Sequence, residues 1–334
     1  MFDKIVNYAT NFKLSDIHIH SDEPIALRVH GSIDVQSGDI ISRQEVEAFI
    51  NSILNDEQKN HLKKQKDCDL SIANDNLRFR VNIYNTINGP AIALRKIETQ
   101  VPSIEDLGLP PAVMKITHER NGLVLVTGPT GSGKSTTLAA IIDRINQERR
   151  ENIITIEDPI EFVHTRKSAI ISQREIGKDA ATFASALRAS LREDPDVILL
   201  GEMRDLETVS LALTAAETGH LVFGTLHTNG APNSINRILD VFPPAQQAQA
   251  RSQLSQSLRL VVTQRLIKRK NGEGRVAAFE VMVNNTAIAN LIRENKIFQI
   301  TQAMQTGKNQ GMMTMDESVK ELVAKGVIDR EEGN

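Results

Sequence analysis

The sequence predicts an α/β protein with two domains, and the chain length and two different hydrophobic patterns support this prediction. At about 150 residues per domain, 334 residues correspond to about two domains. The first 97 residues show the alternation of half-buried strands, mixed with helices. From residue 113 onward, short and uniformly apolar runs alternate with helices, which is typical of a mostly parallel sheet buried on both faces.

The composition is that of a globular protein with a small negative charge. Lysine and arginine together number 39 against 42 aspartate and glutamate, a net charge of −3, whereas a general polyanion binder is normally strongly basic. Aromatic residues are only 4% of the chain and tryptophan is absent, so side chains on which bases could stack are scarce. We therefore expect no nucleic acid among the binding partners.

Cysteine usage and the N-terminus bear on the compartment. Cys68 is the single cysteine, which excludes an internal disulfide and a four-cysteine metal site, so no zinc is expected. The N-terminal stretch lacks the apolar core of a signal peptide, and no apolar run approaches the ~20 residues of a membrane span. We expect a cytoplasmic protein.

Residues 1–97 are expected to form the N-terminal α+β domain. Ser42 and Glu45 form a capping box that predicts the start of a helix, because an apolar stripe with helical spacing follows. Strands are expected where apolar and polar residues alternate, near residues 17–20, 27–30, 70–72, 77–83 and 91–97.

Residues 98–112 contain three prolines between two patterned regions, and this composition predicts an interdomain linker. Residues 113–334 are expected to form the second domain, with a helical C-terminal region from about Thr286. Its buried strands are expected at the apolar runs near residues 123–126, 152–157, 197–200 and 221–225.

A glycine-rich loop predicts a phosphate-binding site at the start of this second domain. Residues 128–135 read G-x-x-x-x-G-K-S between an expected strand and an expected helix, which is the context that the motif requires. Backbone N–H groups and the helix N-terminus would surround the β-phosphate, Lys134 would reach the β- and γ-phosphates, and Ser135 would ligate Mg²⁺. The residues expected to bind the nucleotide are Thr130, Gly131, Ser132, Gly133, Lys134, Ser135 and Thr136.

Polar residues follow the other apolar runs, and these are candidates for hydrolysis. Glu157, Asp158 and Glu161 come after one run, and Glu202 comes after another, where Gly201 stands in place of the expected metal-site aspartate. His227 follows a third run. Because parallel strands end at the same edge of a sheet, we expect these residues near the phosphate loop. Helix capping and loop salt bridges remain an alternative role for Glu157 and Asp158.

Arginines in the N-terminal domain are a further candidate group. Strand alternation places Arg78 and Arg80 on one face, opposite Leu77 and Phe79. On the next expected strand, Arg95 shares its face with Ala91 and Ala93. Arginines on one sheet face could clamp a γ-phosphate. The pattern by itself favours the simpler interpretation, a solvated outer face.

Together these motifs resemble the type II/IV secretion ATPase superfamily and, within it, the type IV pilus retraction ATPases of the PilT family. GPTGSGKST is similar to the Walker A motif, TIEDPIEFVH to the Asp box, DPDVILLGEMRD to the atypical Walker B motif and TGHLVFGTLHTN to the His box. The opening SDIHIHSDEPIALRVHGSI and the C-terminal stretches NTAIANLIRENK and QTGKNQGMMTMDESVKEL also resemble family segments. The resemblance covers nearly the whole chain.

The resemblance implies a role for each matching residue. Glu161 would be the general base, Glu202 the Walker B acid acting through the Mg²⁺ shell, and His227 a γ-phosphate contact. Arg80 and Arg95 would be the N-domain arginines that approach the nucleotide. The fold implied is a PAS-like N-terminal domain followed by a RecA-like P-loop domain with C-terminal helices.

The resemblance also implies an assembly and partners. It predicts an ATP- and Mg²⁺-dependent homohexamer that powers pilus retraction and twitching motility, held at the inner membrane through the pilus machinery. The partners implied are the inner-membrane pilus platform protein and a paralogous pilus ATPase. Ala289 stands where the family has an arginine in its AIRNLIRE segment.

Other functions stay open at this point. An accessory retraction paralogue, a pilus-assembly or type II secretion ATPase, and a RecA-like nucleic-acid translocase all share this core. A nucleotide-controlled scaffold without turnover is a further alternative, although the set Lys134, Ser135, Glu161 and Glu202 argues against it.

Overall fold

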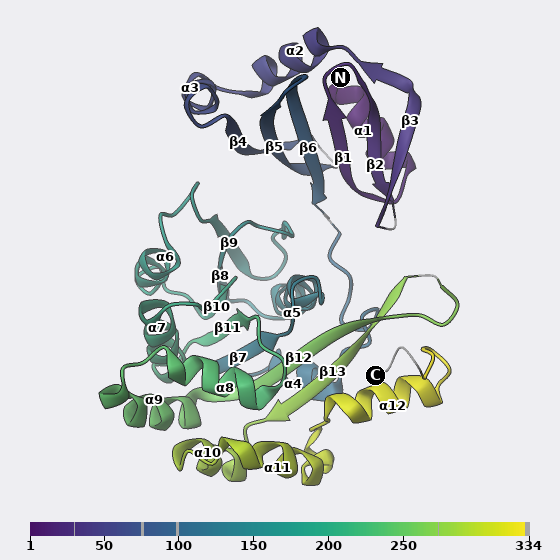
Figure 1. The fold of residues 1–334 in the computed structure, drawn as a ribbon. Coiled ribbons are helices and arrows are strands. Elements are labelled where there is room, and N and C mark those ends of the chain that lie inside the picture. The colour runs from purple at the N-terminus through teal and green to yellow at the C-terminus, as the bar shows by residue number, and fades with distance from the viewer. Residues whose placement is uncertain (30, 75–76, 98–99, 273, 331–334) are drawn as a thin grey trace. The chain divides into compact units, whose positions relative to one another are not determined.

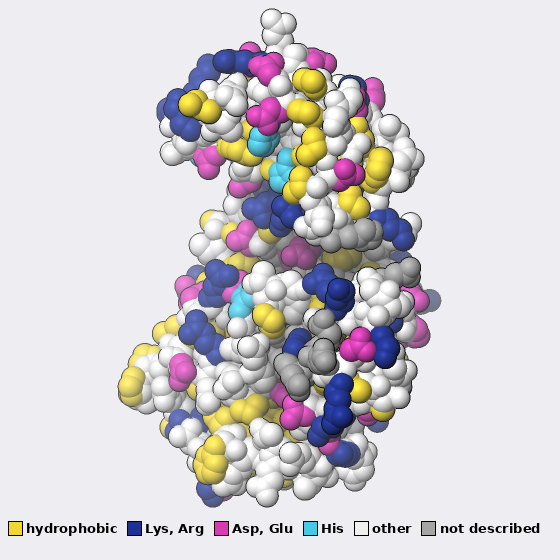
Figure 2. All heavy atoms as spheres, turned by 45° about the vertical axis from the view of Figure 1, so that its right-hand side comes forward, with side chains coloured by type: hydrophobic (Ala, Val, Ile, Leu, Met, Phe, Trp, Pro, Cys, Tyr) yellow, Lys and Arg dark blue, Asp and Glu magenta, His cyan; other side chains and the backbone are white. Residues whose placement is uncertain are grey.

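The computed structural model describes residues 1–29, 31–74, 77–97, 100–272 and 274–330 (Figure 1). The chain divides into two compact units, Met1–Gln100 and Val101–Asn334. Within the described residues, no helix is both long enough and apolar enough to cross a membrane. Figure 2 shows basic side chains interspersed with acidic ones on the face of each unit that it draws, as the small net charge predicts.

The first unit is an antiparallel sheet with helices beside it (Figure 1). The sheet order is β3-β2-β1-β6-β5-β4, and every neighbouring pair is antiparallel. Ser42 caps α2 and forms a capping box with Glu45, which confirms that prediction. The elements are α1 Phe2–Asn11, β1 Leu14–His20, β2 Glu23–Val29, β3 Ser32–Ile41, α2 Arg43–Ile53, α3 Asp56–Gln65, β4 Asp67–Ala73, β5 Arg78–Thr86 and β6 Gly89–Ile97.

Most of the segment 98–112, the predicted linker, groups with the second unit. Ile104 and Leu109 are buried in the core of the second unit, and α4 begins at Pro111. The connection is therefore packed against the second unit, because the apolar side chains between its prolines are removed from water. Residues 98 and 99 lie outside the described part of the chain.

The second unit has a mostly parallel sheet of order β13-β12-β7-β11-β10-β8-β9, in which only β12 and β13 pair antiparallel. This confirms the predicted fold class. Its first elements are α4 Pro111–Ile116, β7 Gly122–Thr127, α5 Lys134–Glu148, β8 Asn152–Glu157, β9 Ile170–Glu175, α6 Phe183–Ser190, β10 Val197–Leu200, α7 Leu206–Glu217 and β11 Leu221–Leu226. The remaining helices and strands are α8 Ala231–Asp240, α9 Pro244–Ser257, β12 Leu258–Lys268, β13 Arg275–Val283, α10 Thr286–Arg293, α11 Ile300–Thr306 and α12 Met315–Ala324.

Helices cover both faces of this sheet, and the strand β7 shows why its sequence is uniformly apolar. Leu123 and Leu125 point into a core shared with α6, α7, α8 and α9, whereas Val124 and Val126 point into a core shared with α4 and α5. All four side chains are completely buried. A strand packed on both faces needs an apolar residue at every position, so the alternation seen in the first unit disappears here.

Candidate active site

The phosphate loop lies between β7 and α5, and its glycines are required by backbone geometry and by close packing. Gly128, Gly131 and Gly133 all have positive φ angles, of 140°, 74° and 88°. A Cβ atom on Gly128 would lie 2.4 Å from the carbonyl oxygen of Gln264, and one on Gly133 would lie 2.8 Å from the Gln264 side-chain amide nitrogen. The loop thus rests directly on β12, where any larger residue would displace it.

Lys134 begins α5, and its side chain is buried beside the loop. Its Nζ donates hydrogen bonds to the carbonyl oxygens of Gly128 and Pro129, at 2.9 and 3.0 Å. Burial lowers the pKa of Lys134, and the negative charges of Glu202 and Glu161 oppose this shift. The charges of Glu202 and Glu161 therefore act on the ammonium group of Lys134.

The ends of two neighbouring parallel strands, β11 and β10, bring two of the other predicted residues to this loop. His227 follows β11, and its Nε2 lies 3.4 Å from Oε1 of Glu202, which follows β10. The other ring nitrogen of His227 lies 3.5 Å from Oγ1 of Thr130 in the phosphate loop. His227 therefore links Glu202 to the phosphate loop, although these residues are far apart in the sequence. The structure thus places His227 and Glu202 together beside Thr130 of the phosphate loop.

Gly201 occupies the place where the sequence pattern led us to expect an aspartate, and the structure gives a steric reason. A Cβ at this position would lie 3.2 Å from the Cα of Glu157 and 3.3 Å from the carbonyl oxygen of Ile156. The N–H of Gly201 also donates to that carbonyl, at 2.8 Å. The glycine lets the end of β10 approach the end of β8, and it leaves Glu202 as the acid at this strand end.

Glu157 and Glu161 have different surroundings, which separates their roles. The carboxylate of Glu157 accepts hydrogen bonds from Thr155, at 2.7 Å, and from Gln173, at 3.3 Å. Burial raises the pKa of Glu157, while these hydrogen bonds act in the opposite direction. The Glu161 side chain is exposed and makes no hydrogen bond or ion pair with the described residues. Glu157 is thus a structural acceptor, whereas Glu161 has its oxygens available for chemistry.

The residues present fit a nucleotide with a divalent cation. The hydroxyl oxygen of Ser132 is buried and has no hydrogen-bond partner within the described chain, so it is available to a phosphate oxygen. Ser135 and Glu202 offer a hydroxyl and a carboxylate, the hard oxygen ligands that Mg²⁺ prefers. Ser135 and Thr136 are half-buried at the start of α5.

Arg80 and Arg95 lie side by side in the first unit. They are directly paired in the register of β5 and β6, and their side chains are 44% and 73% exposed. Nε of Arg95 donates to Oδ1 of Asp16 at 2.8 Å, and Nη2 of Arg80 lies 3.8 Å from Oδ2 of Asp69. Burial raises the pKa of Asp16, but hydrogen bonds from Arg95 and Ser15 outweigh it and leave the pKa lowered. Each arginine therefore already has a carboxylate partner.

The structure also shows contacts of Arg204 and Gln264, two residues that the sequence did not single out. Arg204 forms an ion pair with Glu202, and Gln264 supports the phosphate loop while its side chain accepts a hydrogen bond from Thr137 at 2.7 Å. Gln264 lies on a strand distant in sequence, so no local signal points to it.

His220, at the start of the His box, lies at the opposite end of β11 from His227, where its ring contacts the carbonyl oxygen of Ala215 in α7.

Comparisons with known proteins find similarity over nearly the whole chain. The family model described as Type II/IV secretion system protein matches residues 1–333. A "Twitching motility protein" of Neisseria gonorrhoeae is 52% identical over 303 residues, which cover 90% of this chain and 81% of that protein. The "Type IV pilus retractation ATPase PilT" of Pseudomonas aeruginosa is 50% identical over 318 residues, which cover 95% and 92% of the two chains.

A solved structure extends the similarity from sequence to fold. The crystal structure of the pilus retraction motor PilT with bound ADP is 45% identical and matches with a TM-score of 0.92, covering 99% of this chain and 95% of that chain. Both the sequence relatives and the fold therefore point in one direction. The chain belongs to the Type II/IV secretion system protein family and, within it, to the PilT-like pilus retraction ATPases that its motifs predict.

Proposed function

We propose that this protein is a homohexameric motor that hydrolyses ATP and uses the energy to retract a type IV pilus. The observation that carries this proposal is the convergence of the phosphate loop, Glu202 and His227 at one sheet edge, with the charges of Glu161 and Glu202 acting on Lys134. A scaffold that only binds nucleotide would not need a carboxylate such as Glu161, whose oxygens have no partner among the described residues and whose charge acts on the phosphate-loop lysine.

The chain's own residues divide the work of hydrolysis. The loop N–H groups, Ser132 and Lys134 hold the phosphates of ATP. Glu161 accepts a proton from water while the water oxygen bonds to the γ-phosphorus, and the bond from that phosphorus to the bridging oxygen breaks. ADP and inorganic phosphate leave. Ser135 and Glu202, the latter through water, would hold Mg²⁺, which neutralises charge on the phosphate oxygens.

Three further residues complete the proposed site. His227 contacts the γ-phosphate from its position between Thr130 and Glu202. Arg80 and Arg95 approach the nucleotide from an N-terminal domain and neutralise charge that grows in the transition state. Their lateral pairing presents two guanidinium groups on one sheet face, and guanidinium groups bind phosphate oxygens well.

We further propose where the motor works. Its partners are further copies of this chain in the ring, the inner-membrane platform protein at the pilus base and a paralogous pilus ATPase. The motor lies in the cytoplasm and reaches the inner membrane through these partners. Neither zinc nor nucleic acid takes part.

A phosphate-release assay and a gene deletion test this function together. The wild-type protein should release phosphate from ATP with Mg²⁺, whereas Lys134→Ala should bind ATP weakly and release almost none. A strain without the gene should carry excess surface pili and lose twitching motility, and the wild-type gene should restore both. Cells without pili would instead identify an assembly motor, and an unchanged strain would indicate an accessory paralogue.

A further inference from the structure

The proposed base, Glu161, lies on a segment without regular secondary structure. Residues 158–169, which we name the Glu161 segment, connect the parallel strands β8 and β9 and contain neither helix nor strand. A general base must be held within a fraction of an ångström of its productive position, because a 1 Å displacement can cost on the order of 100-fold in rate. Something outside the segment must therefore fix it.

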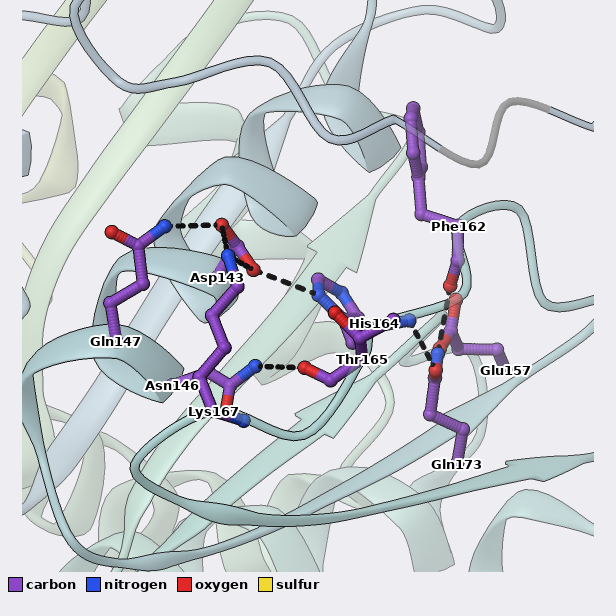
Figure 3. Close-up of polar contacts among 9 residues, drawn as sticks. All are labelled: Asp143, Asn146, Gln147, Glu157, Phe162, His164, Thr165, Lys167 and Gln173. Carbon is purple, nitrogen blue, oxygen red and sulfur yellow. Dashed lines mark hydrogen bonds and ion pairs between the residues drawn. The ribbon is translucent and has the colours of Figure 1, made fainter. Parts of the chain in front are cut away.

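Charged and polar side chains of the helix α5 hold the C-terminal part of this segment, at Thr165 and Lys167 (Figure 3). Nζ of Lys167 lies 2.8 Å from each carboxylate oxygen of Asp143, and Gln147 donates to Asp143 at 2.7 Å. Asn146 donates to the carbonyl oxygen of Thr165 at 2.8 Å and accepts from the N–H of Lys167 at 3.1 Å. One turn of α5 thus grips the end of the Glu161 segment.

The strand β9 holds the middle of the segment, at Phe162 and His164, through Gln173. The side-chain oxygen of Gln173 accepts a hydrogen bond from the N–H of His164 at 2.8 Å, and its amide nitrogen donates to the carbonyl oxygen of Phe162 at 2.8 Å (Figure 3). Gln173 also donates to Glu157. Gln173 therefore fixes the backbone immediately after Glu161.

His164 lies between these two anchors. Its side chain is 2% exposed, and its Nδ1 lies 3.9 Å from Oδ1 of Asp143, whose own side chain is 13% exposed. Phe162 is also buried, whereas Glu161 between the buried Ile160 and Phe162 is exposed. The segment is packed on one side and presents the Glu161 carboxylate on the other.

The position of Asp143 on α5 gives these contacts a consequence for catalysis. The same helix begins with Lys134 and Ser135, which hold the phosphates and the cation in the proposed function. A helix is a rigid element, so a residue anchored to its third turn keeps a fixed distance from the phosphates. A bond from Asp143 to the Glu161 segment would therefore set the base relative to the γ-phosphorus.

We infer that Asp143 is a positioning residue, which through its bidentate contact with Lys167 fixes the Glu161 segment on the phosphate-loop helix. This inference rests on the proposed function of Glu161 as the base. Asp143 touches neither nucleotide nor water in this proposal, and it acts only by holding the base. Its loss should therefore lower kcat and leave the KM for ATP nearly unchanged.

The test compares two neighbouring residues of α5. Asp143→Asn keeps the shape but removes the charge that Lys167 contacts, and we expect kcat to fall about tenfold with less than about a twofold change in KM. Arg144→Gln is the matched control, because Arg144 makes its ion pairs with Glu105 and Glu148, away from the Glu161 segment. It should keep kcat within about twofold of the wild type.

A second variant and a second background keep the result interpretable. Lys167→Gln removes the other half of the ion pair from an exposed position, so it should fold even where Asp143→Asn does not, and it should lower kcat in the same direction. In a Glu161→Gln background, Asp143→Asn should have little further effect, because its target is already inactive. An equal loss in both backgrounds, or an unchanged kcat in Asp143→Asn and Lys167→Gln, would overturn the inference. Full turnover by Glu161→Gln alone would instead contradict the proposed function.

Discussion

The phosphate-loop edge of the second unit and the arginine pair of the first unit are built in different ways. The phosphate loop is shaped by its own backbone, with three glycines at positive φ and β12 packed directly beneath. Arg80 and Arg95 are long side chains on the exposed face of an antiparallel sheet, held by carboxylates. The first arrangement fixes its groups in advance, whereas the second can exchange one anion for another.

This difference suggests a division of tasks between the two units. A preformed loop binds phosphate without reorganising, which suits the part of a site that is always needed. The ion pair between Arg80 and Asp69 is exposed on both sides, and such pairs contribute only about 0.2–1 kcal/mol of stability, so a phosphate group can displace Asp69 at small cost. Arg80 is therefore suited to a contact that is made and broken during each cycle.

The largest expected effect concerns whether the arginines serve their own chain or a neighbour in the ring. Arg80→Ala should lower turnover by about 10³–10⁵, the range typical of arginine fingers. Mixing Arg80→Ala with Lys134→Ala subunits should restore part of the activity, because some interfaces would then combine an intact loop with intact arginines. Phosphate release by the mixture measures this.

Arg78→Ala is the control for that experiment. Arg78 lies on the same strand two residues away, in register with Ile97 rather than with Arg95, so it should retain most of the turnover. If the mixture stays inactive although exchange of subunits is demonstrated by a separate label, Arg80 does not act on a neighbouring chain.

The next effect tests the preformed edge itself. Glu161→Gln keeps the size of the side chain but cannot accept the proton, so hydrolysis should fall by about 10²–10⁴ while ATP still binds. Phosphate release and binding of a fluorescent ATP analogue measure the two properties separately. Glu157→Gln is the matched comparison: it should mainly destabilise the protein, because Glu157 accepts structural hydrogen bonds. Turnover near the wild-type rate in Glu161→Gln would exclude this residue as the base.

A smaller effect should appear when the partner of one arginine is changed. Asp16→Asn removes the charge that holds Arg95, so the guanidinium should attract phosphate more strongly and the KM for ATP should fall. Because Arg95 is largely exposed, we expect the KM to fall by at most about fivefold, which is equivalent to about 1 kcal/mol. Steady-state kinetics at low salt would measure it, and a higher KM would show that Asp16 orients Arg95 rather than competing for it.

The smallest effect is a pH dependence of stability in the second unit. Burial lowers the pKa of His164 from its ordinary value of 6.5, with Asp143 opposing and Lys167 assisting this shift. In the unfolded chain His164 therefore takes up a proton near pH 6.5, whereas in the folded chain it stays neutral until a lower pH. The free energy of unfolding consequently falls as the pH drops below 6.5. Between pH 7.5 and 5.5, the free energy of unfolding of the His164→Gln variant should fall by about 1 kcal/mol less than that of the wild type. Urea unfolding at the two pH values measures this difference. Equal losses in both proteins would contradict the prediction.

Local sequence determined those features that depend on neighbouring residues. The glycine spacing of residues 128–135 specifies the phosphate loop, Ser42 and Glu45 specify a helix start, and the uniformly apolar runs specify strands buried on both faces. In each case the cause is a short-range backbone or side-chain preference, so the pattern is readable without the fold. The motifs also indicated the family.

The tertiary structure decided the contacts that depend on strand order. The placement of β11 between β7 and β10 brings His227 to both Thr130 and Glu202, and a strand from elsewhere in the chain puts Gln264 under the loop. The same is true of Asp143 and the Glu161 segment, and of the apolar residues that draw most of the predicted linker into a domain core. These contacts join distant residues, and no local propensity encodes them, because they form only once the sheet has set which strand ends are neighbours.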